Sequence, residues 1–189
     1  MFNIKSLGVF CGSSNGKNED FVKDAAKLGR LLAKNNIRLV YGAGHVGMMG
    51  AIAKATLEAG GQVTGIINTL LQEREKQILK LTELKILPSL HIRKDAMFEA
   101  SDAFCILPGG IGTLDEVFEI TTLKQLGEHH KPIIMYNAHG FWEPFRKIID
   151  SLVAEGYAQP QHAKLVTYVD NVEDILPAID AEIKAWESK

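Results

Sequence analysis

The feature that most constrains the fold of this chain is a regular alternation of short apolar runs with longer helical segments. In the first helical segment, Phe21, Leu28 and Leu32 are spaced to form one buried helix face. Strands that alternate with helices in this way predict a parallel sheet that is covered by helices on both faces. We therefore expect a doubly wound, Rossmann-like α/β fold, with its ligand site beyond the carboxyl ends of the strands. The expected strands are residues 6–10, 37–41, 62–67, 84–87, 103–107, 132–136 and 165–169.

Length and composition narrow the class of protein further. The chain has 189 residues, enough for one domain with a full core, so we expect residues 1–189 to form a single domain. Its net charge of −2 and lack of a long Lys/Arg run predict no nucleic-acid partner and no membrane surface. No run is apolar enough to span a bilayer, and the first residues lack a secretory pattern. With Cys11 and Cys105 read as free thiols, these features predict a cytoplasmic location.

A glycine-rich stretch, residues 108–116 (PGGIGTLDE), joins the apolar run 103–107 to a helical segment that continues to about Leu126. Closely spaced glycines leave backbone N–H groups unshielded, and at the start of a helix such groups form an anion site, usually for phosphate. An alternative is a capping box, with Thr113 as N-cap and Glu116 three residues later. The capping box accounts for those two residues but not for the glycines ahead of them. We therefore expect a phosphate site with a carboxylate beside it.

Two other glycine turns are weaker candidates for a phosphate site. Residues 12–18 resemble a Walker A loop only loosely, because the glycine and lysine spacing is one residue short and Asn18 replaces Ser/Thr. In that turn, helix capping and ligand contact by Ser13 or Ser14 are equally good interpretations, and both can hold. Residues 42–47 (GAGHVG) match G-x-G-x-x-G, but they follow the second expected strand, and no acid ends the third. A dinucleotide site is therefore disfavoured, and close backbone packing explains these glycines equally well.

Two motifs together resemble one known family. Residues 108–116 are similar to the PGGxGTxxE signature of the Lonely Guy family, which consists of cytokinin riboside 5′-monophosphate phosphoribohydrolases once labelled possible lysine decarboxylases. Residues 90–97 (LHIRKDAM) resemble the family's partner motif, M-H-x-R-K-x-x-M. Two departures stand out, since Leu90 replaces the usual Met and Ala43 replaces a common Gly. Leu for Met nearly conserves volume, whereas Ala43 leaves less room at its turn.

The resemblance implies an activity and a set of site residues. The implied reaction is hydrolysis of a purine nucleoside 5′-monophosphate, such as AMP, to the free base and ribose 5-phosphate, with no cofactor and no metal. Arg93 and Glu116 would be catalytic, and the backbone of the glycine loop would hold the 5′-phosphate. The implied substrate-binding residues are Ser13, Gly44, Glu83, Leu90, Lys94, Met97, Gly109, Gly110, Ile111, Gly112 and Thr113.

The chemistry of this reaction suits the two residues that the resemblance makes catalytic. Cleavage of an N-glycosidic bond builds positive charge on the ribose, which a carboxylate such as Glu116 can stabilise. Arg93 is a permanent cation that can hold Glu116 ionised, so we expect no unusually raised pKa for Glu116. An alternative function is a nucleotide or molybdenum-cofactor carrier of the same fold, without turnover. A pyridoxal-phosphate decarboxylase is disfavoured, because no lysine lies in a recognisable Schiff-base context.

The helix that follows the glycine loop is unusual, because its apolar residues are distributed around its whole circumference. A helix that is apolar on all sides must be covered on all sides. In a domain of this size, a second subunit is the simplest cover, so we expect a homodimer that packs along the helix from Leu114 to Leu126. The apolar residues are Leu114, Val117, Phe118, Ile120, Leu123 and Leu126.

Overall fold

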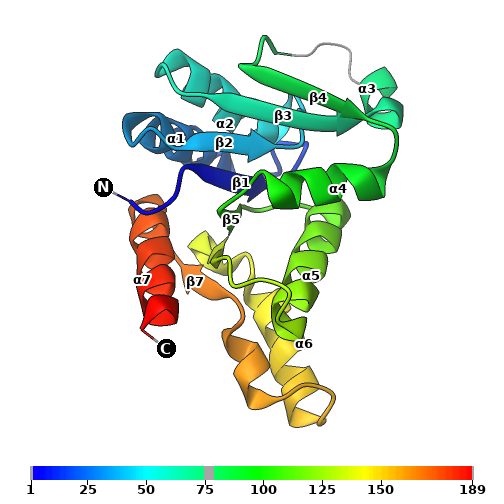
Figure 1. The fold of residues 1–189 in the computed structure, drawn as a ribbon, viewed down its shortest axis with the longest axis vertical. Helices are drawn as coiled ribbons and strands as arrows, with labels where there is room; N and C mark the ends of the chain where they lie inside the picture. Colours follow the sequence, from blue (N-terminus) through cyan, green and yellow to red (C-terminus); the bar gives the residue numbers. More distant parts are fainter. Residues whose placement is uncertain (1, 75–78, 189) are drawn as a thin grey trace.

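A computed structural model describes residues 2–74 and 79–188 of the chain. The seven strands of this part of the chain lie in one sheet, and every pair of neighbours is parallel, in the order β4-β3-β2-β1-β5-β6-β7 (Figure 1). The expected doubly wound α/β fold is confirmed, while the extent of the domain, 1–189, stays a prediction. The strands are β1 (Ser6–Phe10), β2 (Arg38–Tyr41), β3 (Val63–Asn68), β4 (Glu83–Leu87), β5 (Ala103–Ile106), β6 (Ile133–Tyr136) and β7 (Thr167–Val169).

Helices cover both faces of the sheet, and each face has its own core. Alternate strand residues point to opposite faces, so Val9 packs into one core and its neighbour Phe10 into the other. The first core includes α1 (Asp20–Lys34), α2 (Gly47–Glu58) and α7 (Ile175–Glu187), and the second includes α4 (Leu90–Glu99), α5 (Ile111–Leu126) and α6 (Glu143–Ala154). The shorter elements are α3 (Thr69–Arg74), η1 (Ala138–Gly140), η2 (Pro160–Lys164) and η3 (Val172–Asp174).

The strand order places a ligand crevice at the middle of the sheet. The chain winds outward from β1 through β4 and then returns to form β5 on the other side of β1. At such a reversal, the loops beyond the carboxyl ends of the two central strands diverge and leave a crevice. Here Gly12 N, after β1, donates a hydrogen bond of 3.0 Å to Pro108 O, after β5. The glycine loop, residues 108–112, therefore lies at the point where this fold places ligands.

The start of α5 differs from the capping box considered as an alternative. Gly110 is the N-cap, with extended backbone, and Leu114 N donates to Gly110 O at 3.1 Å. Thr113 therefore lies inside the first turn, and the interpretation of Thr113 as N-cap is wrong. The reason is that a glycine can extend the helix start into the loop, which brings the first turn three residues closer to the strand. By contrast, the Ser89 Oγ caps α4 by accepting from Ile92 N at 3.3 Å.

None of the helices in the described part of the chain combines the length and the apolar character needed to cross a bilayer. The cytoplasmic location expected from the sequence stays a prediction.

Candidate active site

A cavity of about 370 Å³ lies at the carboxyl ends of the central strands. It is formed by the turns after β1 and β2, by the end of β3 with α3, by α4, and by the glycine loop that opens α5. Elements that are distant in sequence thus meet at one site, as the strand order requires. The lining residues are Cys11, Gly12, Ser13, Gly42, Met49, Ile67, Leu71, Arg93, Gly110, Ile111, Gly112, Thr113 and Glu116.

The glycine loop presents a helix start to this cavity. The first N–H groups of a helix have no partner within the helix, and they carry the positive end of its dipole. At Gly110 and Gly112, a Cβ would meet nothing within 4 Å, so a ligand can approach the backbone closely. Thr113 is buried, and its hydroxyl packs so closely on Gly109 that a Cβ there would overlap it. The loop can therefore bind an anion with backbone N–H groups and one hydroxyl.

Arg93 is held inside this cavity by three contacts. Its Nε donates to the backbone oxygen of Ile66 at 3.0 Å, and its Nη1 donates to Glu116 Oε1 at 3.2 Å. Its Nη2 lies against the backbone of Gly42, where a Cβ would overlap it. The side chains of Arg93 and Glu116 are only 9% and 12% exposed, so this ion pair is largely removed from water. A buried arginine is thus fixed beside the one carboxylate among the described residues that line this cavity.

Glu116 has a perturbed titration. Burial raises the pKa of its carboxyl above the usual range, and the charge and hydrogen bond of Arg93 offset only part of that rise. The expectation that Glu116 has no raised pKa is therefore wrong. A motif shows that an arginine is near, but not how completely the fold excludes water from both partners. Burial in the finished fold is the larger effect here.

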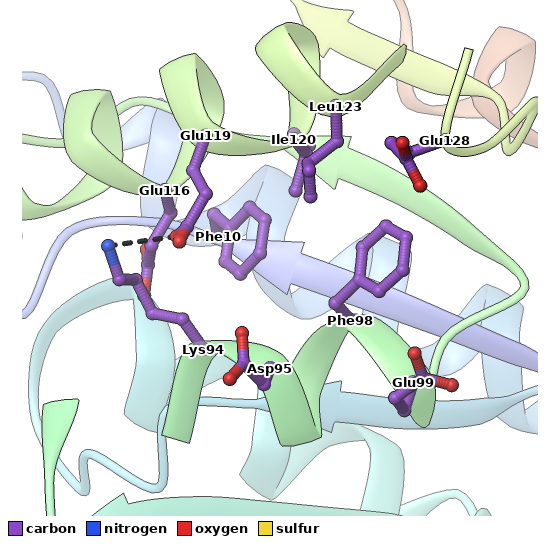
Figure 2. Close-up of a pocket in the computed structure, with 10 residues that line it drawn as sticks. All are labelled: Phe10, Lys94, Asp95, Phe98, Glu99, Glu116, Glu119, Ile120, Leu123 and Glu128. Atoms are coloured by element: carbon purple, nitrogen blue, oxygen red, sulfur yellow. Dashed lines mark ion pairs between the residues drawn. The ribbon is translucent and has the colours of Figure 1, made fainter. Parts of the chain in front are cut away.

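A second cavity, of about 310 Å³, lies on the other side of Glu116. Figure 2 shows two phenylalanines, Phe10 and Phe98, between α4 and α5, with charged side chains around them. Lys94 is held there by ion pairs from its Nζ to Glu119, at 2.8 Å, and to Asp115, at 3.1 Å. Glu116 lines both cavities. The remaining lining residues are Asp95, Glu99, Ile120, Leu123 and Glu128.

The structure brings together most of the residues that the motifs predicted for the site. Gly44 and Gly109 lie just behind the cavity wall, since a Cβ at Gly44 would meet the side chain of Met49, which lines the cavity. Lys94 lines the second cavity, with its ammonium group paired to acids of α5. The predicted residues that line the first cavity are Ser13, Arg93, Gly110, Ile111, Gly112, Thr113 and Glu116.

Three other predicted site residues lie away from both cavities. Met97, one turn after Arg93, is 1% exposed and packs in the core beneath α4. Leu90, the first residue of α4, is 41% exposed and lines neither cavity. Glu83 is on the edge strand β4, where it accepts a hydrogen bond from Thr64 Oγ1 at 3.0 Å. That these three residues contact the substrate stays a prediction.

The motifs missed several residues that line the first cavity. Gly42 had a signal, since it opens the G-x-G-x-x-G turn after β2, but its packing against Arg93 could not be read from that pattern. Met49, Ile67 and Leu71 read as ordinary apolar positions of helices and a strand. Their position at the cavity follows from the order of strands in the sheet, which no local pattern specifies.

In the described part of the chain, His, Cys, Asp and Glu side chains do not gather in groups of three or more that could hold a metal ion.

Comparison with known proteins identifies the family. Residues 49–179 match the family model described as possible lysine decarboxylase. The chain belongs to this family. It is 37% identical, over 94% of its own length and 82% of the relative's, to a cytokinin riboside 5′-monophosphate phosphoribohydrolase of Arabidopsis thaliana. It is 38% identical to a protein of the same name from Rhodococcoides fascians, over 93% of this chain and 89% of that one. The resemblance drawn from the two motifs is confirmed.

Solved structures with the same fold include carriers of the molybdenum cofactor. The carrier protein of Chlamydomonas reinhardtii superposes with a TM-score of 0.70 at 21% identity, over 95% of this chain and 98% of that one. A molybdenum-cofactor binding protein from Rippkaea orientalis gives 0.69 at 22% identity, over 94% and 96% of the two chains. At this level of identity, the likeness establishes a shared fold alone.

Proposed function

We propose that this protein hydrolyses the N-glycosidic bond of purine nucleoside 5′-monophosphates, releasing the free base and ribose 5-phosphate. The observation that carries the proposal is the Arg93–Glu116 pair, fixed at 3.2 Å in the same cavity as the helix start that can bind phosphate. Relatives that are 37% and 38% identical to this chain over the aligned residues are named for that activity on cytokinin riboside 5′-monophosphates. A protein that only binds phosphate has no need of a carboxylate next to the phosphate site, because the carboxylate would repel the anion.

Each part of the cavity has a role in this reaction. The 5′-phosphate binds the N–H groups at residues 111–113 and the Thr113 hydroxyl, which supply donors and the positive end of the α5 dipole. Glu116, one turn further along α5, then faces the ribose and stabilises the positive charge that develops at its anomeric carbon. The same carboxylate orients the attacking water or takes its proton. The catalytic group is thereby held at a fixed distance from the phosphate by one helix.

Arg93 keeps Glu116 in the form that the reaction needs. Burial favours the protonated, neutral carboxyl and so raises the pKa of Glu116, while the Arg93 guanidinium favours the charged carboxylate. Activity that depends on the carboxylate is therefore lost as the pH falls through this raised pKa. We expect the acidic limb of the pH–rate profile to lie above the range of an exposed glutamate.

The deciding experiment is incubation with AMP while adenine and ribose 5-phosphate are measured. Release of both products supports the proposal. If AMP binds, by calorimetry, but neither product forms over many enzyme equivalents and hours, the hydrolase proposal fails and a nucleotide or cofactor carrier takes its place. Rates on AMP, GMP and an N6-prenylated AMP then separate cytokinin production from general nucleotide salvage.

We also propose that the protein is a homodimer that packs along α5. Val117 and Ile120 of this helix face the core, but Phe118 and Leu126 are 39% and 67% exposed. A contiguous exposed apolar patch commonly marks a protein interface, and we propose that both side chains belong to one. Sedimentation at micromolar concentration should give a dimer, and Phe118→Glu should give a monomer. Ile86→Glu, at an exposed position of β4, is the matched control that should stay dimeric.

A further inference from the structure

We propose that Gly42 is a positioning residue for this reaction, whose lack of a side chain lets the Arg93 guanidinium lie against Glu116. The proposal rests on the proposed function, because it assigns Gly42 a role through the catalytic pair. Gly42 is the first residue after β2, and it lines the same cavity as both members of that pair.

The space beside Gly42 is occupied by Arg93. A Cβ built on Gly42 would overlap Arg93 Nη2 and would come within 3.3 Å of Met49 Sδ. At Gly42 the backbone conformation itself does not require glycine, because its φ is not positive. The next residue, Ala43, adopts a φ of 61° although it carries a side chain. What position 42 requires is therefore room for the guanidinium, and not an unusual backbone.

Arg93 cannot make that room without losing its other contacts. Its Nε is bonded to the backbone of Ile66 and its Nη1 to Glu116, and the residue is 7% exposed. A rigid, planar guanidinium that is fixed at two nitrogens shifts as a unit. A side chain at position 42 would thus push Arg93 away from Ile66, from Glu116, or from both. The added Cβ would clash with the end of a long side chain rather than with backbone. The protein should therefore still fold, while the Arg93–Glu116 pair is disrupted.

Displacement of Arg93 has a consequence that can be measured. The carboxyl of Glu116 would stay buried without its cation, so its pKa would rise further. The other charges near it would not compensate. Lys94 on α4 is already paired with Asp115 and Glu119 of α5, and Asp95 adds a negative charge in the second cavity. On the β1 side, burial holds the Cys11 thiol neutral by raising its pKa far above the usual range.

The test is a double-mutant cycle of Gly42→Ala and Arg93→Lys, with AMP hydrolysis as the readout. In the wild-type background, Gly42→Ala should lower kcat by about 100-fold, the scale of a small misplacement of a catalytic group. The KM for AMP should change less, and the acidic limb of the pH–rate profile should move to higher pH. Lysine lacks Nη2, so in the Arg93→Lys background Gly42→Ala should lower kcat by no more than about threefold. Such non-additive effects are expected of two residues in direct contact.

Three outcomes would overturn the proposal. The first is an unchanged kcat and pH profile in Gly42→Ala, and the second is an equal loss in both backgrounds, which marks general damage to the turn. The third concerns folding. If Gly42→Ala does not fold, the double variant should recover the fold, and failure to do so counts against a clash with Arg93. The proposed function fails separately, when the wild-type protein releases no base from any nucleoside monophosphate. A crystal structure of Gly42→Ala tests the displacement of Arg93 even in that case.

Discussion

Two cavities meet at Glu116, and they differ in the charges that line them. The first is lined by the start of α5 and by Arg93, and Glu116 is the one carboxylate among the described residues that line it. The second, shown in Figure 2, is lined by five carboxylates, Glu116 included, and by one lysine, Lys94, which is already paired with acids of α5. On one side of Glu116 the carboxylates are thus balanced by an arginine and a helix start, and on the other side they are in excess.

This difference indicates the orientation in which a substrate would bind in the proposed site. A nucleoside monophosphate carries its negative charge at one end only, and close charges in a cavity shielded from water interact strongly. A phosphate in the second cavity would face carboxylates, whereas in the first it would face N–H groups and Arg93. We infer that the substrate binds with its phosphate toward the glycine loop. The carboxylate at the boundary is then placed to meet the ribose, where positive charge develops.

The largest effect is expected from Glu116→Gln, which removes the charge that both cavities share. The amide keeps the size of the side chain but cannot stabilise a cation or accept a proton from water. Turnover of AMP should fall by at least about 1,000-fold, on the scale of lost general-base and electrostatic catalysis. Binding of AMP, measured by calorimetry, should be retained. Activity close to that of the wild type would remove Glu116 from the mechanism.

The next largest effect is expected from Arg93→Met, on the pH dependence of stability, because this change leaves Glu116 buried without a cation. The pKa of Glu116, already raised, should rise further, so the folded state should hold its proton to higher pH than the unfolded chain does. Between those two pKa values the folded form binds more protons, and the free energy of unfolding therefore falls as the pH rises. Denaturant titrations from pH 4 to 9 should show a steeper fall in the variant than in the wild type. Equal slopes would mean that Arg93 does not control the ionisation of Glu116.

Part of this site could be predicted from the sequence, because it is specified by short, local motifs. The glycine loop and the Arg93 motif each specify a short segment, and the alternation of strands and helices correctly predicts that both reach the carboxyl edge of the sheet. The pattern at Phe21, Leu28 and Leu32 likewise predicts a buried face of α1, and all three residues are buried.

What the sequence could not predict depends on contacts between distant segments. The packing of Gly42 on Arg93 joins the turn after β2 to α4, and Met49 and Leu71 reach the cavity through the winding of the chain. The raised pKa of Glu116 depends in the same way on burial by several elements at once. The motif likewise did not predict that Met97 would be almost fully buried in the core beneath α4.

Thr113→Val is expected to have a moderate effect, confined to the first cavity. Valine has nearly the same shape, so the buried side chain should keep its packing on Gly109 while one hydroxyl is lost. A hydrogen bond to a charged group contributes about 1.5–3 kcal/mol, which corresponds to a rise of about 10- to 100-fold in the KM for AMP. Because the phosphate is distant from the bond that breaks, kcat should change much less. A kcat that falls as strongly as KM rises would place Thr113 at the reacting centre.

The smallest effect is expected from Glu128→Gln, at the far end of the second cavity. Figure 2 places Glu128 and Glu99 beside Phe98, away from the end where Lys94, Glu116 and Glu119 lie. Removing one exposed charge there weakens the field only slightly, because charges near water are strongly screened. The kcat/KM for AMP should therefore stay within about threefold of the wild-type value, on the scale of an exposed charge interaction. A tenfold change would mean that the substrate extends along the whole second cavity. Glu128 would then contact the substrate directly.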